Sequence, residues 1–367
     1  AGMDVELPDT VCFNEEMKAM FAQGKADMAL LDQAVRRVLR AKFRMGLFEH
    51  PFALTGSALS EMVHHPEDEL ITLQSALESL VLLKNDNHVL PVGKNVRKIA
   101  LIGPHADNAR HFFGGYTHLS MVEAIHAVMN SLAGVDASNT ERKPMLTVPG
   151  TQVQSDETEE FAQIGRQIKP DCPSLLAKLT SSLPDAEITY AYGYPIAGAD
   201  ESHFAEALQA AAGADLVILT LGGKHGSGSV ATMGEGVDAT DINLPRCQDA
   251  FIRAAANLHK PMIGIHFGGR PISSDAADEC LDAILEAWNP SEMGAEALTR
   301  VLTGETAPSG RMPVTTARSA GQIPVYYNHP NGSSWHQGDS IGFQEYVDMP
   351  HRPRYYFGQG LSYTTFA

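Results

Sequence analysis

A single carboxylate in a glycine-rich stretch has the setting of a proton-transferring group. Glu235 stands between Gly234 and Gly236, and two flanking glycines let the backbone turn tightly and leave the side chain unobstructed. The stretch 221–245 follows an apolar run at 215–221 that is typical of a buried parallel strand. Ligands of open α/β sheets bind at the carboxyl ends of such strands. We therefore expect a general acid or base on a mobile loop, with a solvated surface glutamate as the alternative.

The composition is that of a globular protein, and it argues against two classes of partner. The 367 residues are 44% hydrophobic and 19% charged, which is enough for one large or two ordinary domains with a core. The net charge of −17 argues against nucleic acid and anionic membranes as partners. No apolar run is long enough to span a bilayer.

The cysteines and the first residues bear on metal binding and on localisation. The cysteines are far apart and form no CxxC pattern, so we expect free thiols and no metal site. Free thiols favour a reducing compartment such as the cytoplasm. The chain opens at Ala1 in the middle of an expected element, so we interpret it as the later part of a longer protein. Its localisation therefore stays open.

Three parts follow one another along the chain. Residues 1–50 contain amphipathic helical patterns, and residues 51–66 have the composition of a linker. Pro66 suits the first position of a helix that opens the third part, residues 67–367. The apolar stripe of this helix continues to Asn85.

Strand and helix patterns alternate through the third part at intervals of about 30 residues. Apolar runs predict strands at 97–103, 187–191, 215–221, 260–266 and 282–287. This alternation implies a mostly parallel sheet with helices on both faces, an α/β fold. Asp107 and Tyr116 follow the first of these strands, so they are either part of the rim of a ligand site or turn and packing residues.

Two segments of the third part lack a clear period. Residues 134–160 are polar, and we interpret them as a mobile insertion. The tail, residues 320–366, is rich in Tyr, Gly, Pro and His and includes Trp335. Its aromatic side chains either pack onto the domain or stack on sugar rings.

A set of motifs, taken together, resembles glycoside hydrolase family 3, the family of β-glucosidases and β-xylosidases. The motifs occur in order along almost the entire chain, and the second and the last are highly specific. They are Ala1–Pro8, Ala34–Phe48, Leu80–Asn85, Lys98–Pro104, Gly234–Asp238, Leu244–Pro245, Gly269–Pro271, Pro308–Pro313, Pro324–His329 and Tyr356–Phe366.

The resemblance implies a domain organisation. Family members have a (β/α) barrel domain followed by an α/β sandwich domain. Residues 1–50 would then be the C-terminal remnant of the barrel, residues 51–66 the linker, and residues 67–367 the sandwich domain that carries the acid/base loop. The family's nucleophile is an aspartate of the barrel that has no counterpart in this chain, because Asp4 lies beyond that point.

The resemblance also implies a retaining β-glycosidase that hydrolyses terminal β-linked glucose or xylose. Glu235 matches the family's acid/base, and Asp238 is the rival for that role. Lys224 and His225 would contact sugar hydroxyls, with a flexible solvated pair as the alternative. We expect no cofactor. The expected partners are a β-linked oligosaccharide or glycoside and the missing barrel domain, and the apolar helix faces of residues 1–50 would also suit a homo-oligomer.

The sequence departs from the family pattern in two places, and two other classes of function are alternatives. Ala239 and Thr240 follow Asp238, where the family often has an arginine, and Ser291 follows Pro290 in place of the usual glycine. These differences indicate a subgroup. One alternative function is a non-catalytic carbohydrate-binding or assembly module. Another is a nucleotide-binding α/β protein, prompted by the glycines before Glu235, although these lack the order of a P-loop.

Overall fold

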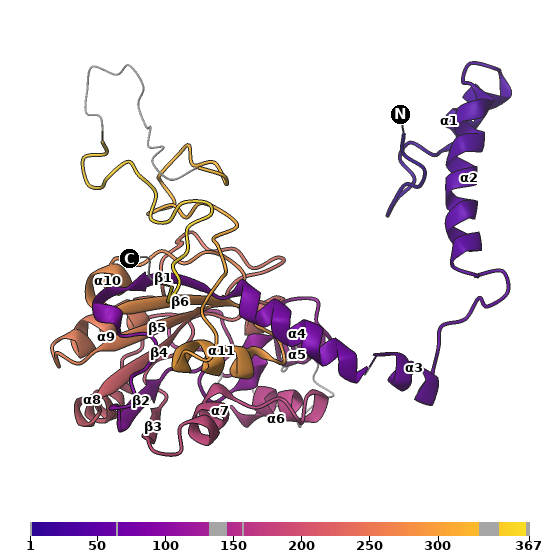
Figure 1. The fold of residues 1–367 in the computed structure, drawn as a ribbon. Coiled ribbons are helices and arrows are strands. Elements are labelled where there is room, and N and C mark those ends of the chain that lie inside the picture. Colours follow the sequence, from indigo (N-terminus) through magenta and orange to yellow (C-terminus); the bar gives the residue numbers. More distant parts are fainter. Residues whose placement is uncertain (1, 64, 132–144, 156–157, 330–344, 365–367) are drawn as a thin grey trace. The chain divides into compact units, whose positions relative to one another are not determined.

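The computed structural model describes residues 2–63, 65–131, 145–155, 158–329 and 345–364 (Figure 1). The chain divides into two compact units, residues 1–66 and 67–367. Trp335 and much of the insertion predicted at 134–160 lie outside the described residues.

The first unit consists of three helices joined by irregular segments. These are α1 (Glu15–Ala22), α2 (Met28–Arg44) and α3 (Gly56–Val63). The side chain of Asp27 caps α2 by accepting a hydrogen bond from the Ala29 N–H at 2.9 Å. Leu31, Val35 and Leu39 of α2 are exposed. Within this unit, α2 therefore has an apolar face without a cover.

A six-stranded sheet forms the centre of the second unit, with strand order β1-β6-β5-β4-β2-β3. The strands are β1 (Val81–Asn85), β2 (Lys98–Ile102), β3 (Glu187–Ala191), β4 (Leu216–Gly222), β5 (Met262–Phe267) and β6 (Ala283–Trp288). In the centre of the parallel region, Leu101 lies opposite Tyr190 of β3 and Ile218 of β4. Every neighbouring pair is parallel except β1 and β6. The prediction of a mostly parallel sheet is confirmed.

The start of the second unit differs from the prediction. Helix α4 (Pro66–Ser79) begins at Pro66 as expected, but the extension of this helix to Asn85 is wrong, because the chain continues as β1. A short continuous apolar run fits a buried strand as well as a buried helix, so its period does not distinguish the two. The free side of β1 is paired by the tail, where the Leu361 N–H donates to Leu82 O at 2.7 Å.

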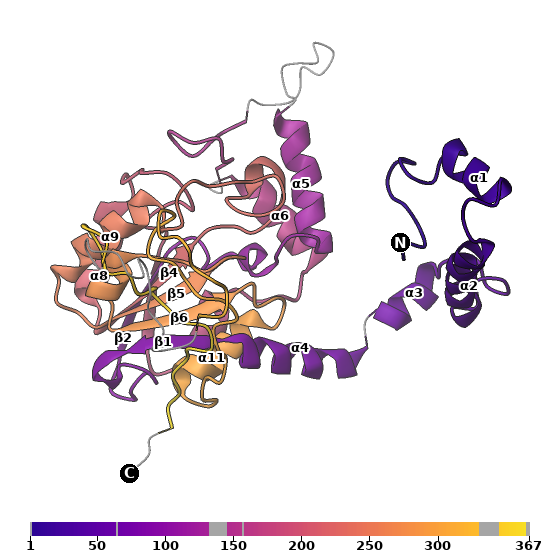
Figure 2. The same ribbon diagram turned by 90° about the horizontal axis from the view of Figure 1, so that it is seen from above.

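Helices cover both faces of the sheet, as predicted (Figures 1 and 2). One layer contains α5 (His118–Ser131), α6 (Glu159–Ile168), α7 (Leu175–Ser182) and α11 (Gly294–Thr303). The other contains α8 (Phe204–Gly213), α9 (Arg246–Ala256) and α10 (Asp275–Cys280). Short 3-10 helices are η1 (Asp86–His88), η2 (Ala109–Phe112) and η3 (Gly228–Val230). Alternate residues of the strands point into two separate hydrophobic clusters, as expected for a sheet buried on both sides.

The described part of the tail is partly packed and partly exposed. Tyr355 is buried, and Tyr363 donates its hydroxyl proton to Val301 O at 2.8 Å. Tyr326 and Tyr327 are exposed. Packing onto the domain therefore accounts for some of these rings and not for others.

Two general findings concern the described residues. None of their helices has both the length and the apolar character needed to cross a membrane. The cysteines are free thiols, as predicted: Cys12, Cys172, Cys247 and Cys280.

Candidate active site at the carboxyl edge of the sheet

The carboxyl ends of β2 and β4 lie side by side where the strand order reverses. Strand β2 has β3 on one side and β4 on the other, so the connections that leave β2 and β3 run to opposite sides. Ligands of open α/β sheets bind outside such a switch point. The segment 103–117 after β2 carries Tyr116, and the segment 223–245 after β4 carries Glu235.

These two segments meet in a direct hydrogen bond. The hydroxyl of Tyr116 donates to Glu235 Oε2 at 2.5 Å, and both side chains are exposed. The bond to the carboxylate raises the pKa of the Tyr116 phenol above its ordinary value, so Tyr116 remains a donor at neutral pH. The backbone of Tyr116 has φ +65°, a conformation that non-glycine residues rarely adopt outside functional sites and tight turns. With 70% of its surface exposed, Tyr116 is not a packing residue.

Glu235 lies at the tip of a tight turn. The Val237 N–H donates to Gly234 O at 3.2 Å, which leaves Glu235 and Gly236 as the central residues of the turn. Gly234 passes so close to the neighbouring chain that a Cβ there would lie 1.9 Å from Gly226 O. The turn therefore requires glycine at position 234 for space, and it directs the carboxylate outward.

The base of the segment that carries Glu235 is closed by backbone hydrogen bonds. The Thr232 N–H donates to Lys224 O at 2.9 Å, and the Gly226 N–H donates to Met233 O at 3.0 Å. The glycines of this segment therefore form a folded loop with joined ends. Glu235 and Asp238 both project from the part that follows this closure, and both are exposed.

His225 connects three of the segments that leave the sheet. Its Nδ1 accepts hydrogen bonds from the Gly115 N–H after β2 (3.3 Å) and from the Asn289 amide after β6 (3.1 Å). Burial, together with the charge of Lys224, lowers the pKa of His225, so the ring is neutral at pH 7. Because Nδ1 accepts, the proton of the neutral ring lies on Nε2. The half-buried ring thus connects the loops through Nδ1 and retains Nε2–H as a hydrogen-bond donor.

Lys224 has a different environment from its neighbour. Its side chain is completely buried, so the alternative of a flexible solvated lysine is wrong. The ammonium donates to Phe113 O at 2.6 Å and to Ser120 Oγ at 3.0 Å, and it lies 3.4 Å from Glu123 Oε2. This arrangement leaves no exposed surface of Lys224 for a sugar hydroxyl.

Sequence patterns did not single out several residues of this site. Arg110, Glu123 and Ser120 are buried beside Lys224, and Asn289 holds His225. Their only sequence signal is that they follow strand ends or lie in the first turns of α5. Asp107, which was considered for the rim, accepts a hydrogen bond from Ser174 at the start of α7 (3.2 Å), which fits the turn role.

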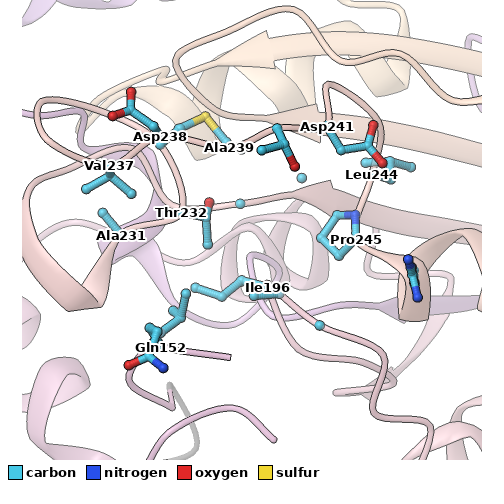
Figure 3. Close-up of a pocket in the computed structure, with 18 of the residues that line it drawn as sticks. Gln152, Ile196, Ala231, Thr232, Val237, Asp238, Ala239, Asp241, Leu244 and Pro245 are labelled. Atoms are coloured by element: carbon cyan, nitrogen blue, oxygen red, sulfur yellow. The ribbon is translucent and has the colours of Figure 1, made fainter. Parts of the chain in front are cut away.

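A cavity of about 880 Å³ lies against the loop that carries Glu235 (Figure 3). Asp238, Ala239 and Asp241 lie on one side of it, and Gln152 and Ile196 lie on the opposite side. The cavity is lined by carboxylates, amides, hydroxyls, two arginines and apolar groups, a mixture suited to a polyhydroxylated ligand. Among the described residues, no group of three or more His, Cys, Asp or Glu side chains is placed to hold a metal ion.

Comparison with known proteins agrees with this fold. The sequence model of the glycosyl hydrolase family 3 C-terminal domain matches residues 80–363. The chain belongs to glycosyl hydrolase family 3. The six-stranded, mostly parallel sheet and its two helical layers are the α/β sandwich of this family 3 domain.

Its similarity to family 3 relatives extends over the whole chain. The chain is 32% identical to the periplasmic beta-glucosidase of Salmonella typhimurium, covering 100% of this chain and 44% of that protein. It is 31% identical to a putative beta-xylosidase of Formosa agariphila, covering 100% of this chain and 40% of that protein. A crystal structure of a beta-glucosidase from Listeria innocua in complex with isofagomine superimposes with a TM-score of 0.68 at 27% identity, covering 99% of this chain and 43% of that one. The chain thus spans less than half the length of these relatives.

Proposed function

We propose that this chain is the C-terminal part of a retaining β-glycosidase that removes terminal β-linked glucose or xylose, and that Glu235 is its general acid/base. The observation that carries the proposal is the exposed Glu235 carboxylate, bonded to Tyr116 at the carboxyl edge of the sheet in a family 3 domain. The choice of sugar follows the names of the relatives, which are beta-glucosidases and beta-xylosidases.

The proposed reaction has two steps. A carboxylate nucleophile from a barrel domain outside this chain attacks the anomeric carbon, and Glu235 gives its proton to the departing glycosidic oxygen. Glu235, now a carboxylate, then takes a proton from water as the water attacks the anomeric carbon and releases the nucleophile. Tyr116 occupies only Oε2 of Glu235, which leaves Oε1 for the leaving oxygen or the water. Its hydroxyl is placed to stabilise the carboxylate between the two steps.

We also propose that residues 1–50 belong to the end of that barrel, with residues 51–66 as the connection to the sandwich domain. The uncovered apolar side chains of α2 support this proposal. Burying them against barrel elements would stabilise the whole protein by about 25 cal/mol for each Å² removed from water.

Replacing Glu235 in the full-length enzyme tests the proposed function. Glu235→Ala should lower turnover of alkyl glycosides by about 10²- to 10⁴-fold. Turnover of dinitrophenyl glycosides should fall less, because an activated leaving group needs little protonation. Azide should restore turnover of the dinitrophenyl substrate, since this anion attacks the glycosyl-enzyme without a general base.

Asp238→Ala is the matched control, because Asp238 is an exposed carboxylate in the same segment. It should leave the ratio of alkyl to dinitrophenyl turnover unchanged. Equal losses on both substrates in Glu235→Ala, without rescue by azide, would argue against Glu235. The same leaving-group dependence in Asp238→Ala would transfer the role to Asp238.

A second candidate function is carbohydrate binding without catalysis, and the cavity of Figure 3 favours it. Neither Glu235 nor Tyr116 lines this cavity, so a sugar bound there would not need them. Calorimetric titration of the chain with cellobiose and xylobiose, repeated with Asp241→Asn, measures such binding. Binding that Asp241→Asn weakens, together with a full-length protein that does not turn over glycosides, would favour this second function.

A further inference from the structure

A buried ionic cluster lies directly beneath the two segments of the proposed active site. Glu123 on α5 is its centre: Arg110 Nε donates to Glu123 Oε1 at 2.6 Å, and Lys224 Nζ lies 3.4 Å from Glu123 Oε2. All three side chains are at most 1% exposed. Arg110 belongs to the segment after β2, Glu123 to α5, and Lys224 to the segment after β4. Three separate parts of the fold therefore meet in this cluster.

Lys224 connects the segment after β4 to the other two parts. Its ammonium donates to Phe113 O, three residues before Tyr116, and to Ser120 Oγ on α5. It also donates to His225 O at 3.3 Å, within its own segment. The backbone of Lys224 closes the base of the loop through Thr232. The Lys224 side chain thus connects the backbone close to Tyr116 with the segment that carries Glu235.

We propose that Lys224 is a positioning residue, which fixes the segment that carries Glu235 against the segment that carries Tyr116 and so places the acid/base carboxylate. This inference rests on the proposed function of Glu235. Lys224 itself does not touch the substrate, because it is completely buried.

The energetics of buried charges favour a positioning role over a role in stability. Taking two charges out of water costs several kcal/mol for each ion, so a buried ion pair is weak evidence for stability. Its better-attested use is to select one arrangement of the surrounding chain. Burial lowers the pKa of Lys224 to about 8 while the nearby Glu123 opposes this shift, so the ammonium is charged at pH 7. A charged donor makes stronger hydrogen bonds to Phe113 O and Ser120 Oγ than a neutral one.

Hydrogen exchange on the chain itself tests the coupling without any activity measurement. In Lys224→Met, we expect the amides of 223–236 and of 112–117 to exchange at least about tenfold faster, the factor for one to two lost hydrogen bonds. Amides of β5 should be unchanged. Lys178→Met is the matched control, because Lys178 pairs with Glu296 between α7 and α11 and neither residue belongs to the two segments. Exchange of 223–236 that stays at the wild-type rate, or that rises without 112–117, would overturn the inference.

Leaving-group dependence in the full-length enzyme separates positioning from general loss of structure. Lys224→Met should lower turnover of alkyl glycosides by about 100-fold, the effect of misplacing a catalytic group by about 1 Å. Dinitrophenyl glycosides should be affected less, because they need little help from the acid. Lys178→Met should change neither. Equal losses on both substrates would overturn the positioning role.

The two proposals fail in distinguishable ways. If Glu235→Ala shows no leaving-group dependence, the proposed function fails, whereas the exchange experiment still reports on the coupling of the two segments. If Glu235→Ala behaves as expected and Lys224→Met leaves turnover unchanged, only the positioning role fails.

A milder variant covers the case in which Lys224→Met does not fold. Ser120→Ala removes a single acceptor of the Lys224 ammonium and leaves the ion pair with Glu123 in place. We expect exchange of 223–236 to rise by about fivefold, the contribution of one hydrogen bond. No change in exchange would count against the inference.

Discussion

Tyr116 and Glu235 form a hydrogen bond across the switch point of the sheet, with 2.5 Å between Tyr116 Oη and Glu235 Oε2. Their segments leave different strands, β2 and β4, which are neighbours only because the strand order reverses between them. The bond therefore joins the two loops that an α/β sheet ordinarily uses to hold a ligand.

Tyr116→Phe tests what this hydroxyl does while it keeps the aromatic ring. We expect turnover of alkyl glycosides by the full-length enzyme to fall about three- to tenfold, the contribution of one hydrogen bond. The free energy of unfolding should change by less than about 0.5 kcal/mol, because the side chain is exposed. Chemical denaturation and steady-state kinetics measure both. A large loss of stability would mean that Tyr116 supports the fold instead.

Titration of the Tyr116 phenol gives a second test of its hydrogen bond to Glu235. Because the carboxylate raises the pKa of Tyr116, replacing it by an amide in Glu235→Gln should return this pKa toward its ordinary value. NMR of the chain with labelled tyrosine follows the single signal that disappears in Tyr116→Phe. An unchanged pKa in Glu235→Gln would show that the two side chains do not interact in solution.

The acid/base candidate was accessible to sequence analysis, whereas its surroundings were not. A buried strand followed by glycines around one carboxylate is a local pattern, and it placed Glu235 at the ligand edge. The contact with Tyr116 depends on strand order, which alternation of strands and helices does not specify. Lys224 follows a strand among glycines and so has the sequence context of an exposed residue, yet its burial depends on Glu123 of a distant helix. The edge strand β1 was missed because its apolar run has no period of its own.

The chain alone should not hydrolyse glycosides. In the proposed mechanism the glycosyl-enzyme forms on a nucleophile of the barrel domain, and without that group the first step cannot occur. The assay uses purified chain with aryl β-glucosides and β-xylosides, and the full-length enzyme is the positive control. Turnover by the chain that a glycosidase inhibitor abolishes would contradict this expectation.

His225 should be energetically coupled to Asn289, whose amide donates to its ring. His225→Ala and Asn289→Ala should each lower the free energy of unfolding by about 1 kcal/mol, and the double variant should show a coupling of about 1 kcal/mol. Asn257→Ala is the matched control, because the amide of Asn257 donates only to the backbone of α9. Chemical denaturation of the variants measures these values. If the coupling of His225→Ala with Asn289→Ala is no larger than its coupling with Asn257→Ala, the hydrogen bond adds nothing to stability.

His105 should make the second unit sensitive to acid. Its ring is buried and bonds to Gly223 O at 3.0 Å, and burial lowers its pKa to about 4 from the usual 6.5. Between these values the unfolded chain binds a proton that the folded chain does not, so the free energy of unfolding falls as the pH falls. The lowered pKa corresponds to a decrease of about 3 kcal/mol in the free energy of unfolding over this pH range.

His105→Phe removes this titration and retains a ring to stack on Phe267. The variant should be less stable at pH 7, because Gly223 O loses its partner, but it should lose less stability between pH 6.5 and 4 than the wild type. Denaturation at a series of pH values measures the two slopes. His111 is also buried, with a pKa lowered by burial and by the charges of Arg110 and His105, so the slope of the variant contains the titration of His111 without the contribution of His105. Parallel curves would show that His105 does not titrate in this way.

Gly234 and Gly236 flank Glu235 in the same way in the sequence, but alanine at the two positions should have different effects. Gly236 has φ +68° and no atom within 4 Å of an added Cβ, so Gly236→Ala should cost only the left-handed strain, about 1 kcal/mol. Gly234 has φ +136°, and its added Cβ would lie 1.9 Å from the backbone oxygen of Gly226. Gly234→Ala should therefore cost about 3 kcal/mol or displace the turn. Displacement would break the bond from the Gly226 N–H to Met233 O, which hydrogen exchange at Gly226 reports. Equal costs for the two variants, with protection at Gly226 retained, would show that the turn around Glu235 is not packed against Gly226.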